Sequence, residues 1–143
     1  MARSAQILAG VLFAGLFAMA SAPGHTQSSV TMAPSQEHVI EEYRAYIGQD
    51  DLYNSSGARL TQPWQVLRQD RANFHRFGIR HHREEGDSFF ASANNRARME
   101  SMLASGFISR EAGDAILNGN VWVNVQIIGH GTTGRRIRIA VER

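Results

Sequence analysis

The alternation of apolar residues near the C-terminus constrains the fold most. In one segment every second residue is a branched aliphatic: Val121, Val123, Val125 and Ile127. In the next, the same spacing places Ile137, Ile139 and Val141. Side chains of a strand point alternately to its two faces, so this period predicts two strands that each bury one face. The glycine-rich stretch between them predicts an antiparallel hairpin with Gly131-Thr132-Thr133 at its tip.

Matching the two apolar faces sets the register of this hairpin. The expected pairs are Ile127 with Ile137, Val125 with Ile139, and Val123 with Val141. On the opposite face, Gln126 then lies near Arg138 and Ile128 near Arg136. A lone hairpin is only marginally stable in water, so its apolar face must pack on helices or join other strands. Tyr53 or residues 77–81 could supply a short extra strand.

Helical spacing of apolar residues dominates the chain before the hairpin. Residues 37–47 predict a short amphipathic helix on Val39, Ile40, Tyr43, Tyr46 and Ile47. Pro63 fits the first turn of a second helix, with Thr61 or Gln62 at the cap position before it. The buried side of this second helix is expected to carry Trp64, Val66, Leu67, Phe74 and Phe77.

Two further helices are expected before the hairpin. Residues 92–105 predict a helix that ends with Gly106 in the left-handed conformation and Phe107 folded back on Met102. Ser109 can cap a short fourth helix through Leu117. The sequence therefore predicts an α+β fold over residues 37–143, with three or four short helices packed on a small antiparallel sheet that ends in the C-terminal β-hairpin.

The second helix forces a charge towards the core. Leu67 and Phe74 lie two turns apart, and the position between them on that face is Asp70 or Arg71. A buried charge without a partner costs several kcal/mol in this setting. We therefore expect Asp70 to pair with an arginine or with the backbone, as a structural contact and not as a catalytic group.

The N-terminus has the pattern of a secretory signal peptide at residues 1–20. Arg3 supplies the basic region, residues 7–17 are apolar, and Ala18-Met19-Ala20 offers small residues for cleavage before Ser21. Residues 21–36 are rich in small and polar residues, which indicates a flexible leader. We expect a periplasmic or secreted protein with no transmembrane segment in the mature chain. The sequence contains no cysteine, so the mature domain has no disulfides.

All cationic side chains apart from histidine are arginine, because the sequence contains no lysine. Removal of Arg3 with the signal leaves a formal charge of +1, since the whole chain carries +2. That balance is too small to indicate nucleic-acid binding. The charges are unevenly placed, because residues 37–51 are acidic and residues 59–83 are basic. We expect these two segments to pair within the fold; an anionic partner for the basic segment is the alternative.

Arginine binds carboxylates and phosphates with a planar fork of donors. The candidate anion-binding residues are Arg68, Arg76, Arg80, Arg83, Arg136 and Arg138. The partner expected for them is an anionic polymer, a lipid surface or an acidic protein, with no cofactor. The resulting function is that of an exported, non-enzymatic binding or envelope-associated protein.

A second interpretation rests on the histidines of residues 75–87. His75, His81 and His82 supply ligand types suited to zinc, nickel or copper, which would make the protein a metal-binding protein or a small metal-assisted hydrolase. The spacing is poor, because Gly78 and Gly86 weaken a helix here and adjacent residues of a strand point to opposite sides. Residues 80–87 are better explained as an exposed connection between two elements.

Overall fold

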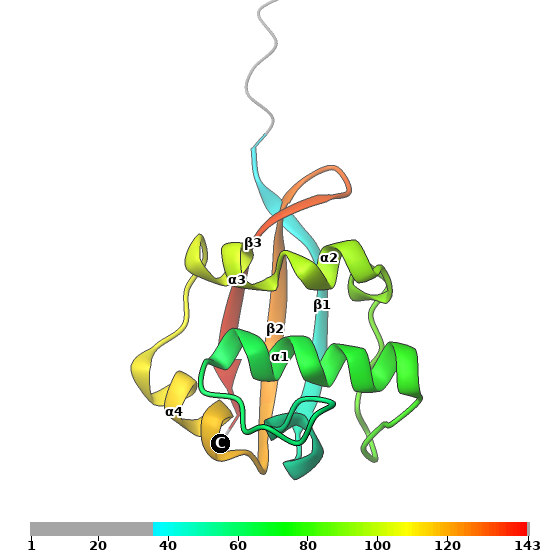
Figure 1. Ribbon diagram of the computed structural model, residues 1–143. Coiled ribbons are helices and arrows are strands. Elements are labelled where there is room, and N and C mark those ends of the chain that lie inside the picture. The colour runs from blue at the N-terminus through cyan, green and yellow to red at the C-terminus, as the bar shows by residue number, and fades with distance from the viewer. Residues whose placement is uncertain (1–35, 143) are drawn as a thin grey trace, which may run out of the picture. The chain divides into compact units, whose positions relative to one another are not determined.

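The computed structural model describes residues 36–142. The sheet of this part of the chain is antiparallel with strand order β1-β2-β3, formed by β1 (His38–Ile47), β2 (Val121–His130) and β3 (Thr133–Val141). One face of the sheet carries the helices α1 (Pro63–Ala72), α2 (Ala93–Ala97), α3 (Met99–Ala104) and α4 (Arg110–Asn118) (Figure 1). The predicted α+β fold is confirmed. The signal peptide and, except for Gln36, the leader predicted before residue 37 lie outside the described residues.

The predicted hairpin is confirmed in its register. β2 and β3 pair Ile127 with Ile137, Val125 with Ile139 and Val123 with Val141, and Gln126 and Ile128 face Arg138 and Arg136. The tip is tighter than expected, because Thr133 already pairs with His130 and leaves Gly131-Thr132 between them. Gly131 adopts a φ of 54°, a conformation that glycine reaches at little cost.

The helix predicted over residues 37–47 is wrong, because this segment forms β1. Tyr43, Ala45 and Ile47 alternate into the core, and β1 pairs along β2 from His38 to Ile47 with a register shift between Val39 and Glu41. β1 therefore adds a third strand to the hairpin, which would be only marginally stable alone. The extra strand considered at Tyr53 is reduced to an isolated bridge with Arg59.

Helix α1 begins at Pro63 as predicted and continues into a π-helical turn, Asn73–Phe77. Val66, Leu67 and Phe74 are buried, as expected. Phe77, by contrast, is 53% exposed. It lies just before Gly78, which ends the helix with a φ of 70°. The predicted apolar face is therefore correct up to Phe74 and wrong at Phe77.

The single helix predicted over residues 92–105 is divided at Arg98 into α2 and α3. Gly106 does not take the left-handed conformation, and Phe107 is 63% exposed instead of folding back on Met102. The Phe107 backbone runs alongside β3, where it bonds to Ile137 and Ile139. Ser109 caps α4 as predicted, since its side chain accepts a hydrogen bond from the Ala112 N–H.

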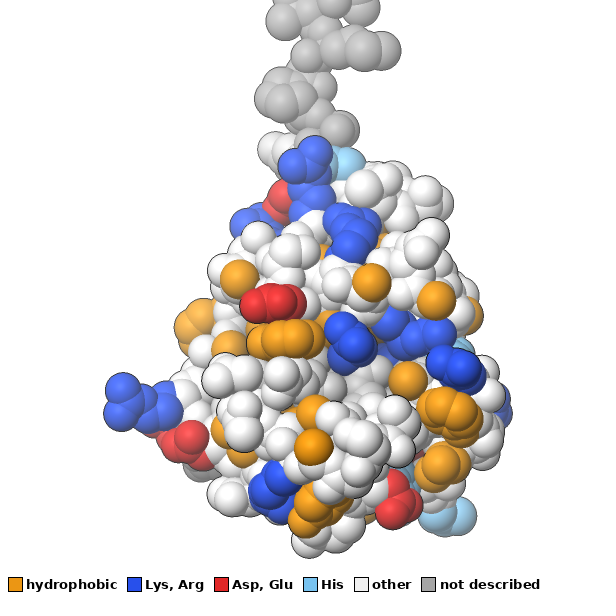
Figure 2. Space-filling view, in the orientation of Figure 1, with side chains coloured by type: hydrophobic (Ala, Val, Ile, Leu, Met, Phe, Trp, Pro, Cys, Tyr) orange, Lys and Arg blue, Asp and Glu red, His pale blue; other side chains and the backbone are white. Residues whose placement is uncertain are grey.

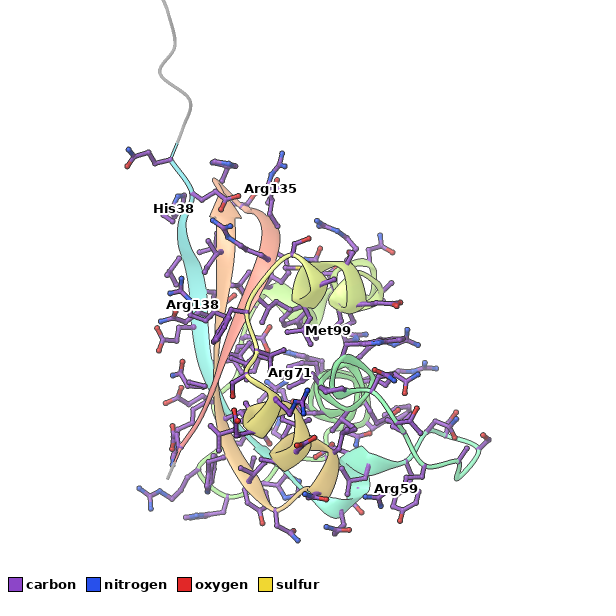
Figure 3. The ribbon with its side chains drawn as sticks, turned by 90° about the vertical axis from the view of Figure 1, so that its left-hand side faces the viewer. His38, Arg59, Arg71, Met99, Arg135 and Arg138 are labelled. Atoms are coloured by element: carbon purple, nitrogen blue, oxygen red, sulfur yellow. The ribbon has the colours of Figure 1, made fainter. Side chains whose placement is uncertain are left out.

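The core lies between the sheet and the helices. In the side view, Arg71 and Met99 occupy this space (Figure 3). Apolar residues of all three strands meet residues of α1, α3 and α4 there, among them Tyr43, Val125, Ile137, Leu67, Met102 and Ile116. Within residues 36–142, none of the helices is long and apolar enough to cross a membrane.

Candidate functional site

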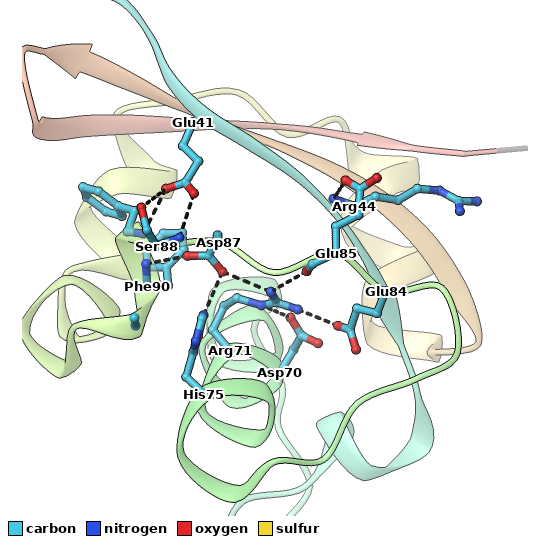
Figure 4. Close-up of polar contacts among 12 residues, drawn as sticks. Glu41, Arg44, Asp70, Arg71, His75, Glu84, Glu85, Asp87, Ser88 and Phe90 are labelled. Atoms are coloured by element: carbon cyan, nitrogen blue, oxygen red, sulfur yellow. Dashed lines mark hydrogen bonds and ion pairs between the residues drawn. The ribbon is translucent and has the colours of Figure 1, made fainter.

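Arg71 is fully buried and is the centre of a charge network that begins on α1. Its guanidinium group lies 2.7 Å from Asp70 Oδ2, 2.5 Å from Glu84 Oε1 and 3.1 Å from Asp87 Oδ2. Figure 4 shows the three carboxylates arranged around it, together with the carbonyl oxygen of Glu85. The predicted pairing of Asp70 with an arginine is confirmed. Its partner is the adjacent Arg71, so both charges at this helix position are buried together.

Two of these carboxylates belong to the connection that follows α1. The side chains of Glu84 and Asp87 are 1% and 0% exposed, so the prediction that residues 80–87 form an exposed connection is wrong at these positions. Asp87 also accepts a hydrogen bond from the Phe90 N–H and lies 2.9 Å from His75 Nε2. Ion pairs of the network therefore hold the connection against α1. The spacing of residues in the sequence does not reveal these pairs.

The same connection is fastened to the edge of β1. Arg44 and Glu85 exchange hydrogen bonds, from the Arg44 N–H to the Glu85 carboxylate and from the Glu85 N–H to the Arg44 carbonyl. Glu41 accepts from the Ser88 and Phe89 N–H groups at 2.7 and 2.9 Å. Unpaired N–H and C=O groups at a strand edge are satisfied here by a loop of the same chain.

A second buried carboxylate, Asp51, lies next to this network. It accepts hydrogen bonds from the Gly48 N–H and the Asn73 amide, and His81 Nε2 lies 3.7 Å away. Burial, followed by repulsion from Asp70, raises the pKa of Asp51 to about 6. These contacts join the end of β1 to the end of α1.

Glu84 is perturbed for the same two reasons. Burial and the neighbouring Asp70 raise its pKa to about 7, while the His81 N–H and Arg71 act in the opposite direction. Burial also opposes the charge of Arg71, but Asp70 and its other neighbours outweigh burial and raise the pKa of Arg71. Arg71 is therefore a permanent cation, whereas Asp51 and Glu84 titrate near neutral pH.

A hollow of about 500 Å³ opens beside the network and is lined by His75, Arg80, His81, Glu84 and Asp87, among others. The hollow brings two of the three candidate metal ligands to one place, but not His82. Within residues 36–142, no three or more histidine or carboxylate side chains are arranged to hold a metal ion. His75 and His81 instead lie next to Asp87 and Asp51.

The candidate anion-binding arginines after Pro63 lie on the surface. Arg68, Arg76, Arg80 and Arg83 are all exposed. Three of them lie over aromatic rings, with guanidinium carbons 5.9 Å from the Trp64 ring, 5.1 Å from Phe77 and 4.2 Å from Phe74, respectively. Stacking of this kind orients a guanidinium group and leaves its edge donors available. In Figure 2, arginine, histidine and hydrophobic side chains are interspersed on the right, beyond the C-terminal end of α1.

The expected pairing of the acids of residues 37–51 with the arginines of the basic segment is wrong, although His81 of that segment lies 3.7 Å from Asp51. Among the described residues, carboxylates form ion pairs with only three arginines, which are Arg44, Arg71 and Arg136. The acids of β1 bind elsewhere: Glu41 binds backbone N–H groups, and Glu42 binds the amides of Asn124 and Gln126. The surface arginines of the basic segment are left without carboxylate partners.

The two candidate arginines of β3 already have partners. Arg136 forms an ion pair with Glu37, and Arg138 donates a hydrogen bond to Gln126 at 3.3 Å. Arg136 also lines a hollow of about 480 Å³ with Arg98 and Arg135. The hollows lined by Arg136 and Arg138 contain none of the candidate arginines after Pro63, and those lined by Arg68 and Arg80 contain neither of the β3 arginines, so among the described residues the six candidates do not line one common hollow.

Comparisons with protein families, with curated proteins and with solved structures give no significant match. The functional interpretation therefore rests on the geometry of the chain itself.

Proposed function

We propose that the protein is an exported, non-enzymatic binding protein that contacts an anionic partner through Arg68, Arg76, Arg80 and Arg83. One observation carries this proposal: these exposed arginines have no carboxylate partner within residues 36–142, and aromatic rings support three of them. Exposed cations without internal partners attract anions at long range, and salt weakens that attraction.

The buried network supports the proposal by holding the segment that bears the arginines. Arg71 anchors Glu84, which directly follows Arg83, and Asp87, which lies three residues further along. The exposed arginines before them therefore extend from a fixed backbone. A fixed surface loses less conformational entropy on binding than a mobile one.

The test is retention of the protein on a dextran sulfate resin, with elution by increasing salt. We expect the wild type to bind, and the double variant Arg76→Gln/Arg80→Gln to elute at clearly lower salt. A matched control, Arg110→Gln/Arg135→Gln, removes the same charge from exposed positions on α4 and β3. Failure of the wild type to bind, or equal losses in both variants, would contradict the proposal.

A further inference from the structure

Exposed apolar side chains gather where the basic segment leaves α1. Phe77 is 53% exposed, Ile79 43% and Tyr53 40%, and the three line one hollow of about 530 Å³. Only two other large apolar side chains within residues 36–142 are exposed to this degree, Val39 and Phe107. Single exposed apolar residues are ordinary on protein surfaces, whereas a group of them marks an interaction site.

Arginines alternate with these apolar residues along the chain. We call residues 76–83 the basic loop; its order is Arg76, Phe77, Gly78, Ile79, Arg80, two histidines and Arg83. The loop thus presents apolar and cationic side chains from the same short stretch. One acid, Asp50, also lines the hollow beside them.

The exposure of Phe77 and Ile79 follows from well-defined backbone geometry. Gly78 has a φ of 70°, and the N–H groups of Gly78 and Ile79 both donate to the Asn73 carbonyl. A Cβ atom added at Gly78 would meet nothing within 4 Å, so this turn faces open space. At its other end the loop is followed by Glu84, which Arg71 holds. The apolar side chains are therefore held outwards by the fold.

We infer that the basic loop docks on an anionic lipid surface, with Phe77 and Ile79 entering the interface between headgroups and acyl chains. This inference rests on the proposed function and names its partner. Arginines attract anionic headgroups, and adjacent apolar side chains gain by leaving water for the acyl region. An anionic polysaccharide would leave Phe77 and Ile79 in water.

An acidic protein fits the loop less well than a bilayer does. Stable protein interfaces cover about 800 Å² on each partner and have an apolar centre. The apolar part of this surface consists of a few side chains with arginines among them. A bilayer needs only shallow entry of such side chains together with nearby cations.

The first measurement asks whether this loop is the part that enters the lipid. The chain has no cysteine, so Ile79→Cys provides a single site for the environment-sensitive fluorophore NBD. Asp114→Cys is the control, because α4 packs its Gly113 against Pro63 at the other end of α1. Protein is expressed from the full sequence and mixed with vesicles of equal parts phosphatidylglycerol and phosphatidylcholine. We expect a blue shift and brighter emission at position 79 alone; no change there would overturn the inference.

The second measurement separates apolar entry from charge attraction by vesicle sedimentation. Phe77→Ser/Ile79→Ser is expected to weaken vesicle binding at least about tenfold, and loss of each arginine about fivefold. Val39→Ser/Phe107→Ser removes a similar pair of exposed side chains elsewhere and is expected to bind as the wild type does. Thermal unfolding of each variant checks that the fold is intact.

The outcomes distinguish this inference from the function on which it rests. Retention of Ile79→Ser on dextran sulfate, together with weakened vesicle binding, supports the lipid partner, because this variant leaves the Phe77 ring in place next to Arg76. Unchanged vesicle binding by Phe77→Ser/Ile79→Ser overturns lipid entry and leaves the anion-binding function standing. Binding to polyglutamate but not to vesicles favours an acidic protein partner instead. Failure of the wild type to bind the dextran sulfate resin contradicts the proposed function itself.

Discussion

Arg71 Nη1 and Asp87 Oδ2 lie 3.1 Å apart, and neither side chain has any exposed surface. This pair joins α1 to the end of the connection that follows it, where Asp87 also accepts a hydrogen bond from the Phe90 N–H. Arg71 therefore neutralises Asp70 and also holds Asp87 next to the buried Phe90, where the connection re-enters the core.

Replacement of Arg71 is expected to be severe. Arg71→Leu would leave Asp70, Glu84 and Asp87 buried without their cation, and loss of one partner from a buried ionic network costs about 3–5 kcal/mol. Urea unfolding at neutral pH measures this loss. The deficit should shrink in acid, because the pKa of Glu84 is raised to about 7 and its protonated carboxyl no longer needs the cation. A deficit that stays constant from neutral to acidic pH would contradict this account of the network.

The stability of the protein is expected to fall as pH rises from about 4 to 7. In the folded protein, the pKa values of Asp51 and Glu84 are about 6 and about 7, above the ordinary values of 3.8 for Asp and 4.5 for Glu. The folded state then binds more protons than the unfolded state in this window, so raising the pH favours unfolding. Each carboxyl contributes at most about 1.4 kcal/mol per pH unit.

Two variants divide this window between the two carboxyls. Asp51→Asn should reduce the slope between about pH 4 and 6, where Glu84 still contributes, and Glu84→Gln should reduce the slope up to about pH 7. Melting temperature against pH is the measurement, with the wild type as reference. A wild-type slope retained in both variants would assign the pH dependence to other groups.

The hairpin could be predicted because its pattern is local. Val123, Val125 and Ile127 alternate over too long a run to fit a helix, and β3 repeats the pattern within a few residues. Strand β1 could not be predicted, because Tyr43 and Ile47 lie four residues apart. That separation fits one face of a helix as well as one face of a strand. Pairing with β2, which lies far along the chain, decides between them.

The network could be predicted only in part for the same reason. The spacing of Leu67 and Phe74 placed a charge at the core boundary, and the partner of Asp70 proved to be its neighbour. Glu84 and Asp87 reach Arg71 across a connection whose path depends on contacts with β1. The sequence signal nearest to these acids is the apolar pair Phe89 and Phe90, which predicts that the chain enters the core there. That pair does not indicate which of the preceding acids is buried.

Processing of the N-terminus tests the expected export. In a host that exports the full chain, the mature protein should begin at Ser21, which intact-mass measurement of the periplasmic or secreted fraction detects. Ala20→Phe should block cleavage at this bond, because the position before the cut requires a small residue. Ala22→Phe lies beyond the bond and is the matched control. A mature protein that retains residues 1–20 would contradict the predicted signal peptide.

Gly106 is expected to tolerate no side chain, because a Cβ atom there would lie 1.7 Å from the Ile137 carbonyl oxygen. Backbone must move to relieve this contact, and such overpacking costs about 1–3 kcal/mol or more. Gly106→Ala should therefore lower the melting temperature. It should also speed amide exchange at Ile139, whose N–H donates to the Phe107 carbonyl. Ser105→Ala, at the exposed neighbouring position, should change stability by less than about 0.5 kcal/mol. If Gly106→Ala matched that control, the close approach of Gly106 to β3 would be disproved.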